Sequence, residues 1–116
     1  MKPIDVVKSY YAAIDAHDMA KARALMRDDF RFDGPMMQAS SPEEMFSQMK
    51  AMGFEYKSHV LHMAENGSTV AALFDCAISS PFKATIRMSE WLTVKDGKIA
   101  SSNLIYDTKK MPAPKA

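Results

Sequence analysis

The sequence contains a single cysteine, Cys76, among its 116 residues. One cysteine cannot form an internal disulfide and cannot supply a cysteine-based zinc site. A free thiol also fits a reducing compartment, so a cytoplasmic location is expected. Cys76 shares its alternation with Phe74 and Ile78, and we interpret it as a small core residue.

Long apolar runs and an excess of one charge are also missing. Asp5 and Lys8 interrupt the N-terminal region, and no stretch approaches the roughly 18 apolar residues of a membrane span. Fifteen basic residues are balanced by fourteen acidic ones, which leaves a net charge of +1. We therefore expect neither a nucleic-acid surface nor a membrane-binding surface.

What the chain has is enough apolar material for one core. Its length suits a single domain, and 47% of its residues are hydrophobic. Methionine is abundant, with eleven copies. Methionine side chains are flexible and polarizable. Two interpretations stay open, a core rich in methionine or a pocket that adapts to an apolar ligand.

Helical periodicity dominates the first half of the chain. Residues 4–16 place apolar side chains at the spacing of one helix face. Asp18 is a suitable N-cap for a second helix. Ser41, Pro42 and Glu44 form a capping-box signature for a third helix, which Gly53 ends. The apolar positions of these helices are Val7, Tyr10, Tyr11 and Ile14, then Met19, Ala22, Leu25 and Met26, then Met45, Met49 and Met52.

A period of two replaces the helical pattern later in the chain. Residues 29–33 predict a short strand that Gly34-Pro35 stops. Four longer strands are predicted at 55–65, 69–79, 82–95 and 98–107. Hairpin turns are expected at Asn66-Gly67 and Asp96-Gly97. Three helices followed by an antiparallel meander predict an α+β domain whose helices pack on one face of a curved sheet, with a cavity between the layers.

Strand 82–95 carries the main functional signal. One parity of this strand is apolar and the other is polar. Glu90 is the exception on the apolar face, and a carboxyl placed there should raise its pKa, find a partner, or lie at a wet pocket mouth. Trp91 has the opposite parity. It predicts a covered outer surface such as a dimer interface, although a lone exposed Trp or one packed under the tail is also possible.

Three segments together resemble the nuclear-transport-factor-2-like superfamily, in particular its SnoaL-like members. They are residues 7–18, 25–35 and 89–99, with 105–108 also typical. The resemblance implies a cone-like roll with three N-terminal helices on a curved antiparallel sheet of four to five strands and an internal apolar pocket. The expected domain is 1–108, with a disordered tail at 109–116.

Similarity to ketosteroid isomerase, a member of this superfamily, implies roles for single residues. Tyr10 falls at the place of that enzyme's helical oxyanion donor, and Glu90 at the place of its protonated acid on the sheet. The enzyme's base directly precedes a proline. In this chain Gly34 precedes Pro35, and Asp33 lies one position earlier. Epoxide-hydrolase members use an Asp-Arg-Asp set, but Arg87 has the wrong parity to pair with Glu90.

The candidate catalytic residues are thus Glu90, Tyr10 and Asp33, with Asp107 as an alternative proton carrier. Candidate substrate-binding residues are Phe32, Met36, Met49, Phe74, Met88, Leu92 and Tyr106. No metal site is expected, because His59 and His62 lie three apart on a strand and should face opposite sides.

Two functional hypotheses remain open at this stage. The first is an isomerase, cyclase or dehydratase that acts without a cofactor on a small apolar carbonyl compound. In it Tyr10 and Glu90 would hydrogen-bond a developing oxyanion and Asp33 would move the proton. The second is a non-catalytic homodimer that binds a small molecule or a partner protein.

Overall fold

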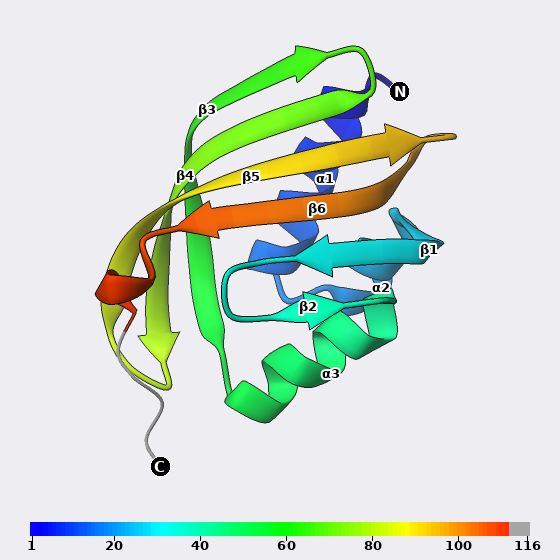
Figure 1. Cartoon of the computed structure of the whole chain (residues 1–116). Coiled ribbons are helices and arrows are strands. Elements are labelled where there is room, and N and C mark those ends of the chain that lie inside the picture. The colour runs from blue at the N-terminus through cyan, green and yellow to red at the C-terminus, as the bar shows by residue number, and fades with distance from the viewer. Residues whose placement is uncertain (112–116) are drawn as a thin grey trace.

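The computed structural model describes residues 1–111. Three helices and six strands follow one another along the chain (Figure 1). The helices are α1 (Pro3–Asp15), α2 (Met19–Ala24) and α3 (Pro42–Met52), and a short 3-10 helix, η1 (Thr108–Lys110), follows the last strand. The strands are β1 (Met26–Asp33), β2 (Gln38–Ala39), β3 (Glu55–Asn66), β4 (Thr69–Ser80), β5 (Ala84–Lys95) and β6 (Lys98–Tyr106).

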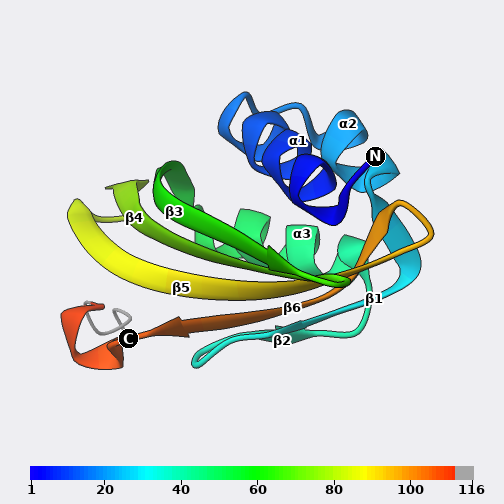
Figure 2. The same ribbon diagram turned by 90° about the horizontal axis from the view of Figure 1, so that it is seen from above.

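All six strands form one curved sheet in the order β2-β1-β6-β5-β4-β3. The meander from β3 to β6 is antiparallel, as predicted. The expectation of a purely antiparallel sheet of four to five strands is wrong, because β1 pairs with β6 in parallel and β2 adds a sixth strand. Figure 2 shows the helices together on one side of this sheet.

Local signals placed the helix ends well. The Ser41 hydroxyl accepts a hydrogen bond from the Glu44 amide, and Gly53 ends α3 with a φ of 69°. That left-handed conformation suits glycine, which has no Cβ. The second helix is shorter than predicted. It ends at Ala24, and the next strand begins at Met26, a fully buried residue.

The two predicted hairpin turns differ in detail. At the second turn both Asp96 and Gly97 have positive φ, as expected. At the first, Asn66 still pairs with Thr69, so the turn lies at Gly67 and Ser68, one residue later than predicted. The strand after Ser80 also starts two residues later than expected, at Ala84.

A bulge in β3 overturns the prediction for its histidines. The pairing register shifts between Val60 and His62. As a result His59 pairs with Asp75 and His62 with Leu73, and both partners lie on the outer face of the sheet. The extra residue of the bulge cancels the alternation that should have separated the two side chains.

The segment expected to be a disordered tail, 109–116, overlaps the described residues at its start. Residues 108–110 form η1, and Met111 packs against the core. The remainder of the predicted tail, 112–116, lies outside the described residues. No helix within residues 1–111 is long and apolar enough to cross a membrane.

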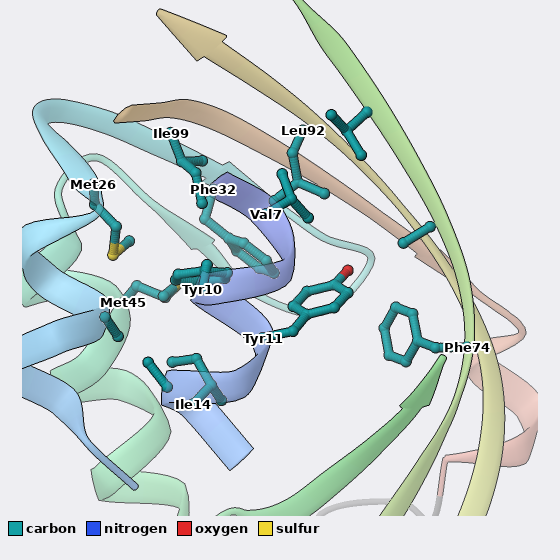
Figure 3. Close-up of a cluster of buried hydrophobic side chains, with 14 of the residues drawn as sticks. Val7, Tyr10, Tyr11, Ile14, Met26, Phe32, Met45, Phe74, Leu92 and Ile99 are labelled. Atoms are coloured by element: carbon teal, nitrogen blue, oxygen red, sulfur yellow. The ribbon is translucent and has the colours of Figure 1, made fainter. Parts of the chain in front are cut away.

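The core lies between the helices and the concave face of the sheet. Its fully buried members include Phe30 and Met26 from β1, Ile86 from β5 and Val7 from α1. Figure 3 shows side chains of α1 facing those of the strands, with Tyr11 directed toward Phe74. The two rings meet edge to face, with their centroids 5.7 Å apart.

Candidate functional site

A cavity of about 470 Å³ opens between the helices and the sheet. This volume falls in the range of about 300–1,000 Å³ that is usual for small-molecule sites. Seven of the eleven methionines line it. They come from the loop after β1, from α3, from β5 and from the segment after η1. They are Met36, Met37, Met45, Met49, Met52, Met88 and Met111.

Aromatic side chains form much of the remaining wall. Six of the seven predicted substrate-binding residues line the cavity: Phe32, Met36, Met49, Phe74, Met88 and Tyr106. Leu92 does not line the cavity. It is fully buried in the core, further along β5 than Met88 and Glu90. The strand pattern predicts which side of the sheet Leu92 faces, but not where along the strand the hollow ends.

Glu90 points from β5 into the space between the layers, as its parity predicts. It is only 8% exposed and lines the cavity. The Tyr11 hydroxyl donates a hydrogen bond of 2.6 Å to its Oε1, and the Ser102 hydroxyl donates a short hydrogen bond to its Oε2. The two carboxyl oxygens are therefore held by groups from α1 and β6.

The environment of Glu90 has opposing effects on its acidity. Burial raises the pKa of Glu90 above its usual value, because water no longer stabilises the charge. The hydrogen bonds from Ser102 and Tyr11 act in the opposite direction, since they stabilise the carboxylate. The net shift of the pKa is upward.

Tyr10 lies beside Glu90 without bonding to it. Its side chain is 6% exposed and lines the cavity, and its ring centroid is 6.1 Å from that of Tyr11. Burial, and then the charge of Glu90, raise the pKa of Tyr10 well above its usual value. The hydroxyl is thus a neutral hydrogen-bond donor at physiological pH.

The two other predicted acids lie away from the cavity. Asp33 is exposed at the end of β1, where its carboxyl accepts a hydrogen bond of 3.1 Å from the Gln38 side chain. Asp107 is exposed and caps η1 through the Lys109 amide. Asp33 alternates with the inward Phe32, so its side chain points outward. Within residues 1–111, Glu90 is the one carboxyl that lines the cavity.

Sequence reasoning missed the partners of Glu90. Ser102 occupies an inward position of β6 and is 3% exposed. It pairs with Leu92, two residues from Glu90, which makes it a diagonal neighbour on the same face. The pairing register of β6 shifts between Ile99 and Ser101, so Ile99 and Ser102 both face inward and simple alternation did not mark Ser102. Tyr10 and Tyr11 both belong to the buried face of α1. Only the rotation of α1 about its axis decides which of the two hydroxyls reaches Glu90.

The remaining predictions concern the outer face and metals. Trp91 is 49% exposed on the outer face, where its indole N–H donates to the Ser89 hydroxyl at 3.1 Å. Arg87 forms an ion pair with Asp75 on that face, 2.9 Å apart, and does not meet Glu90. Cys76 is buried, and burial raises the pKa of its thiol to about 12. No group of three potential metal ligands occurs in the described part of the chain.

Comparison with known families agrees with the resemblance noted in the sequence. The profile of the SnoaL-like domain family matches residues 7–102. None of the curated proteins matches the chain significantly.

Solved structures give the same fold. An NTF2-like protein of unknown function from Cytophaga hutchinsonii is 25% identical, with a TM-score of 0.83 over 94% of this chain and 93% of that one. A proposed polyketide cyclase from Pseudomonas putida is 21% identical, with a TM-score of 0.81 over 95% of each chain. An LEH-like epoxide hydrolase from M. tuberculosis is 16% identical, with a TM-score of 0.83 over 94% and 85%.

Proposed function

This chain belongs to the SnoaL-like domain family, and from that premise we propose that it is a cofactor-independent acid/base enzyme acting on a small apolar carbonyl compound in the cavity. One observation carries the proposal. Glu90 is a buried carboxyl, oriented by two hydroxyl groups, at the wall of an otherwise apolar hollow. The reaction would be of the isomerase, cyclase or dehydratase type. Two solved structures with this fold are named as an epoxide hydrolase and a polyketide cyclase, which supports an enzymatic role for the cavity.

Because Asp33 and Asp107 lie outside the cavity, Glu90 itself is the group to transfer the proton. Its carboxylate would remove a proton from the carbon next to the substrate carbonyl. A poorly solvated carboxylate is a stronger base than an exposed one. The same carboxyl would then return the proton to another carbon, or to a leaving hydroxyl group.

Tyr10 is placed to stabilise the charge that develops on the carbonyl oxygen. Its hydroxyl has no protein partner among the hydrogen bonds of residues 1–111, so it is free to donate to an oxyanion. Tyr11 has a different role in this proposal. It is a positioning residue, because it holds Glu90 and does not face the substrate with a free hydroxyl.

The test uses exchange of carbon-bound hydrogen, which does not require the natural substrate. A panel of small apolar ketones in deuterated buffer is followed by NMR for loss of the signals next to the carbonyl. Wild-type protein should accelerate exchange for members that fit the cavity, and E90Q should reduce that rate by about 10²–10⁴-fold. E65Q, which changes an exposed carboxyl on β3, is the matched control.

The pH dependence gives a second readout. Exchange should rise with pH as Glu90 ionises, with a midpoint above the ordinary value of about 4.3 for Glu. If E90Q exchanged hydrogen at the wild-type rate, Glu90 would have no part in the mechanism.

The alternative function is a non-catalytic binding module. One observation favours it, namely that protein hydroxyls already hydrogen-bond both oxygens of Glu90. In that case ligands bind to the cavity without hydrogen exchange, and E90Q binds them as wild type does. The exchange and binding measurements together separate the two functions.

We also propose that the protein is a cytoplasmic homodimer that associates through its outer sheet face. Trp91 and Ile105 are large apolar side chains, 49% and 58% exposed. Their neighbours in the sheet register are uncharged: Asn103 and Ala71 flank Trp91, and Ser89 lies beside Ile105. An uncharged band with a central tryptophan suits a second copy of the same face.

A further inference from the structure

Three tyrosines line the cavity with hydroxyls that have no hydrogen-bond partner in the described part of the chain: Tyr10, Tyr56 and Tyr106. Tyr10 from α1 and Tyr56 from β3 both line the cavity, and neither hydroxyl takes part in a hydrogen bond within residues 1–111. Tyr11, the neighbour of Tyr10, donates to Glu90 instead. A buried phenol usually finds a partner for its O–H group, because an unmade hydrogen bond costs free energy. Within residues 1–111 no fully buried polar side-chain atom lacks a hydrogen-bond partner, so these hydroxyls are reachable from the cavity and can donate to an oxygen atom of a molecule that enters it.

These two phenols and Glu90 lie close enough to influence one another. Burial is the largest cause that raises the pKa of Tyr10 and of Tyr56, and the charge of Glu90 raises both further. Tyr56 also contributes to the upward shift of the pKa of Tyr10. Burial, and then Cys76, raise the pKa of Tyr106, the other cavity tyrosine with a free hydroxyl, and Glu90 does not contribute to that shift. Tyr10 and Tyr56 thus form a local pair of donors beside the acid.

The rest of the wall restricts the charge of any ligand. No lysine, arginine or histidine within residues 1–111 lines the cavity, and its one ionisable carboxyl is Glu90. An anionic group would lose its hydration without gaining a cation, and it would face a carboxyl that can carry the same charge. A neutral molecule avoids both costs.

The methionine and aromatic side chains of the wall favour aromatic ligands. Methionine sulfur makes favourable contacts with aromatic rings, and aromatic side chains favour edge-to-face or offset packing. Seven methionines and eight aromatic residues surround the hollow. Such a wall can pack against a flat ring system. Apart from the tyrosines and Glu90, it carries few polar side chains.

We propose that the Tyr10 and Tyr56 hydroxyls form an oxygen-binding subsite, and that the cavity selects neutral aromatic carbonyl compounds over their carboxylate analogues. This inference deepens the proposed function, on which it rests for the acid/base role of Glu90. The subsite itself concerns binding and can be measured without turnover.

Equilibrium dialysis with three matched probes tests the subsite. The probes share a naphthalene ring: 2-acetonaphthone carries a neutral carbonyl, 2-ethylnaphthalene has no oxygen, and 2-naphthoate is ionised at neutral pH. The ketone should bind to wild-type protein at least about tenfold more tightly than the carboxylate. It should also bind more tightly than the hydrocarbon.

The variants Y10F and Y56F remove one hydroxyl each and keep the ring. Each should weaken ketone binding by about 5–10-fold, the effect of one hydrogen bond, with little change for the hydrocarbon. T85V removes an exposed hydroxyl from β5 outside the cavity. It should leave the ratio of ketone to hydrocarbon affinity within about twofold. Thermal unfolding of each variant checks that the fold is intact.

The outcomes separate this inference from the proposed function. Equal binding of ketone and carboxylate, no measurable ketone binding, or unchanged ketone binding in both Y10F and Y56F would overturn the subsite. Ketone binding that depends on Tyr10 and Tyr56, combined with no hydrogen exchange in any ketone, would retain the subsite and reject the enzyme.

Discussion

The hydroxyl of Tyr11 lies 2.6 Å from the carboxyl of Glu90, and this contact joins α1 to β5 across 79 positions of sequence. It is one of the polar contacts between the helical layer and the sheet; in another, the Ser58 amide of β3 donates to the Asp15 carboxyl of α1. Ser102 completes the arrangement around Glu90 from β6. The contact therefore links the orientation of the candidate catalytic group to the packing of the first helix.

Replacing Tyr11 with Phe should raise the pKa of Glu90 further. The Tyr11 hydroxyl stabilises the carboxylate form of Glu90 and so lowers its pKa. Without this hydroxyl, only the hydrogen bond from Ser102 opposes the upward effect of burial. The variant should also lose about 1–3 kcal/mol of stability, because a buried acceptor is left with one donor fewer. Carbon-13 NMR titration of the Glu90 carboxyl measures the first effect and urea unfolding the second. Tyr10 makes no hydrogen bond to Glu90, so the variant Y10F should shift the pKa of Glu90 less than Y11F does. Equal shifts in the two variants would contradict the prediction.

The pH dependence of stability should carry the signature of Glu90. Its native pKa is raised, so the folded protein holds the proton more tightly than the unfolded chain does. Stability from this group is therefore full below the unfolded pKa of about 4.3 and falls as pH rises through the native pKa. Urea unfolding of wild type and E90Q at several pH values isolates the effect. We expect the wild type to lose stability relative to E90Q as pH rises, and a constant difference would reject a shifted Glu90.

Charge on the outer sheet face should dissociate the proposed dimer. W91E places a carboxylate at the centre of the uncharged band, and in a symmetric pair it faces its own copy. Size-exclusion chromatography with light scattering should show a dimer for wild type and a monomer for W91E. M19E adds the same charge to the exposed surface of α2 and should remain dimeric. A wild-type monomer at micromolar concentration would end the dimer proposal.

Phe30 should be essential to packing but not to the site. It is fully buried on β1 and does not line the cavity. F30A should lower the free energy of unfolding by about 3–5 kcal/mol, since it removes a large side chain and leaves a void. M19A, at a position 39% exposed, should change it by no more than about 0.5 kcal/mol. Similar urea midpoints for the two variants would show that β1 is not part of the core.

Much of the fold could be predicted because its signals are local. The capping residues around α3 and the alternation in β4 and β5 act within a few positions of the chain. The parallel pairing of β1 with β6 could not be predicted in this way, since these strands are brought together only by the completed roll. The β3 bulge likewise has no local mark, and it reversed the expected side of His62.

The candidate site divides along the same line. By itself the sequence determined that Glu90 faces an apolar layer, because a strand alternates strictly and Glu90 stands among inward apolar neighbours. Only the tertiary structure decided that Tyr11 and Ser102 hold this acid, that Asp33 stays outside, and that Leu92 lies beyond the hollow. The physical reason is that periodicity fixes the direction of a side chain within its own element. Distances between elements depend on helix rotation, sheet curvature and register, which arise when the whole chain packs.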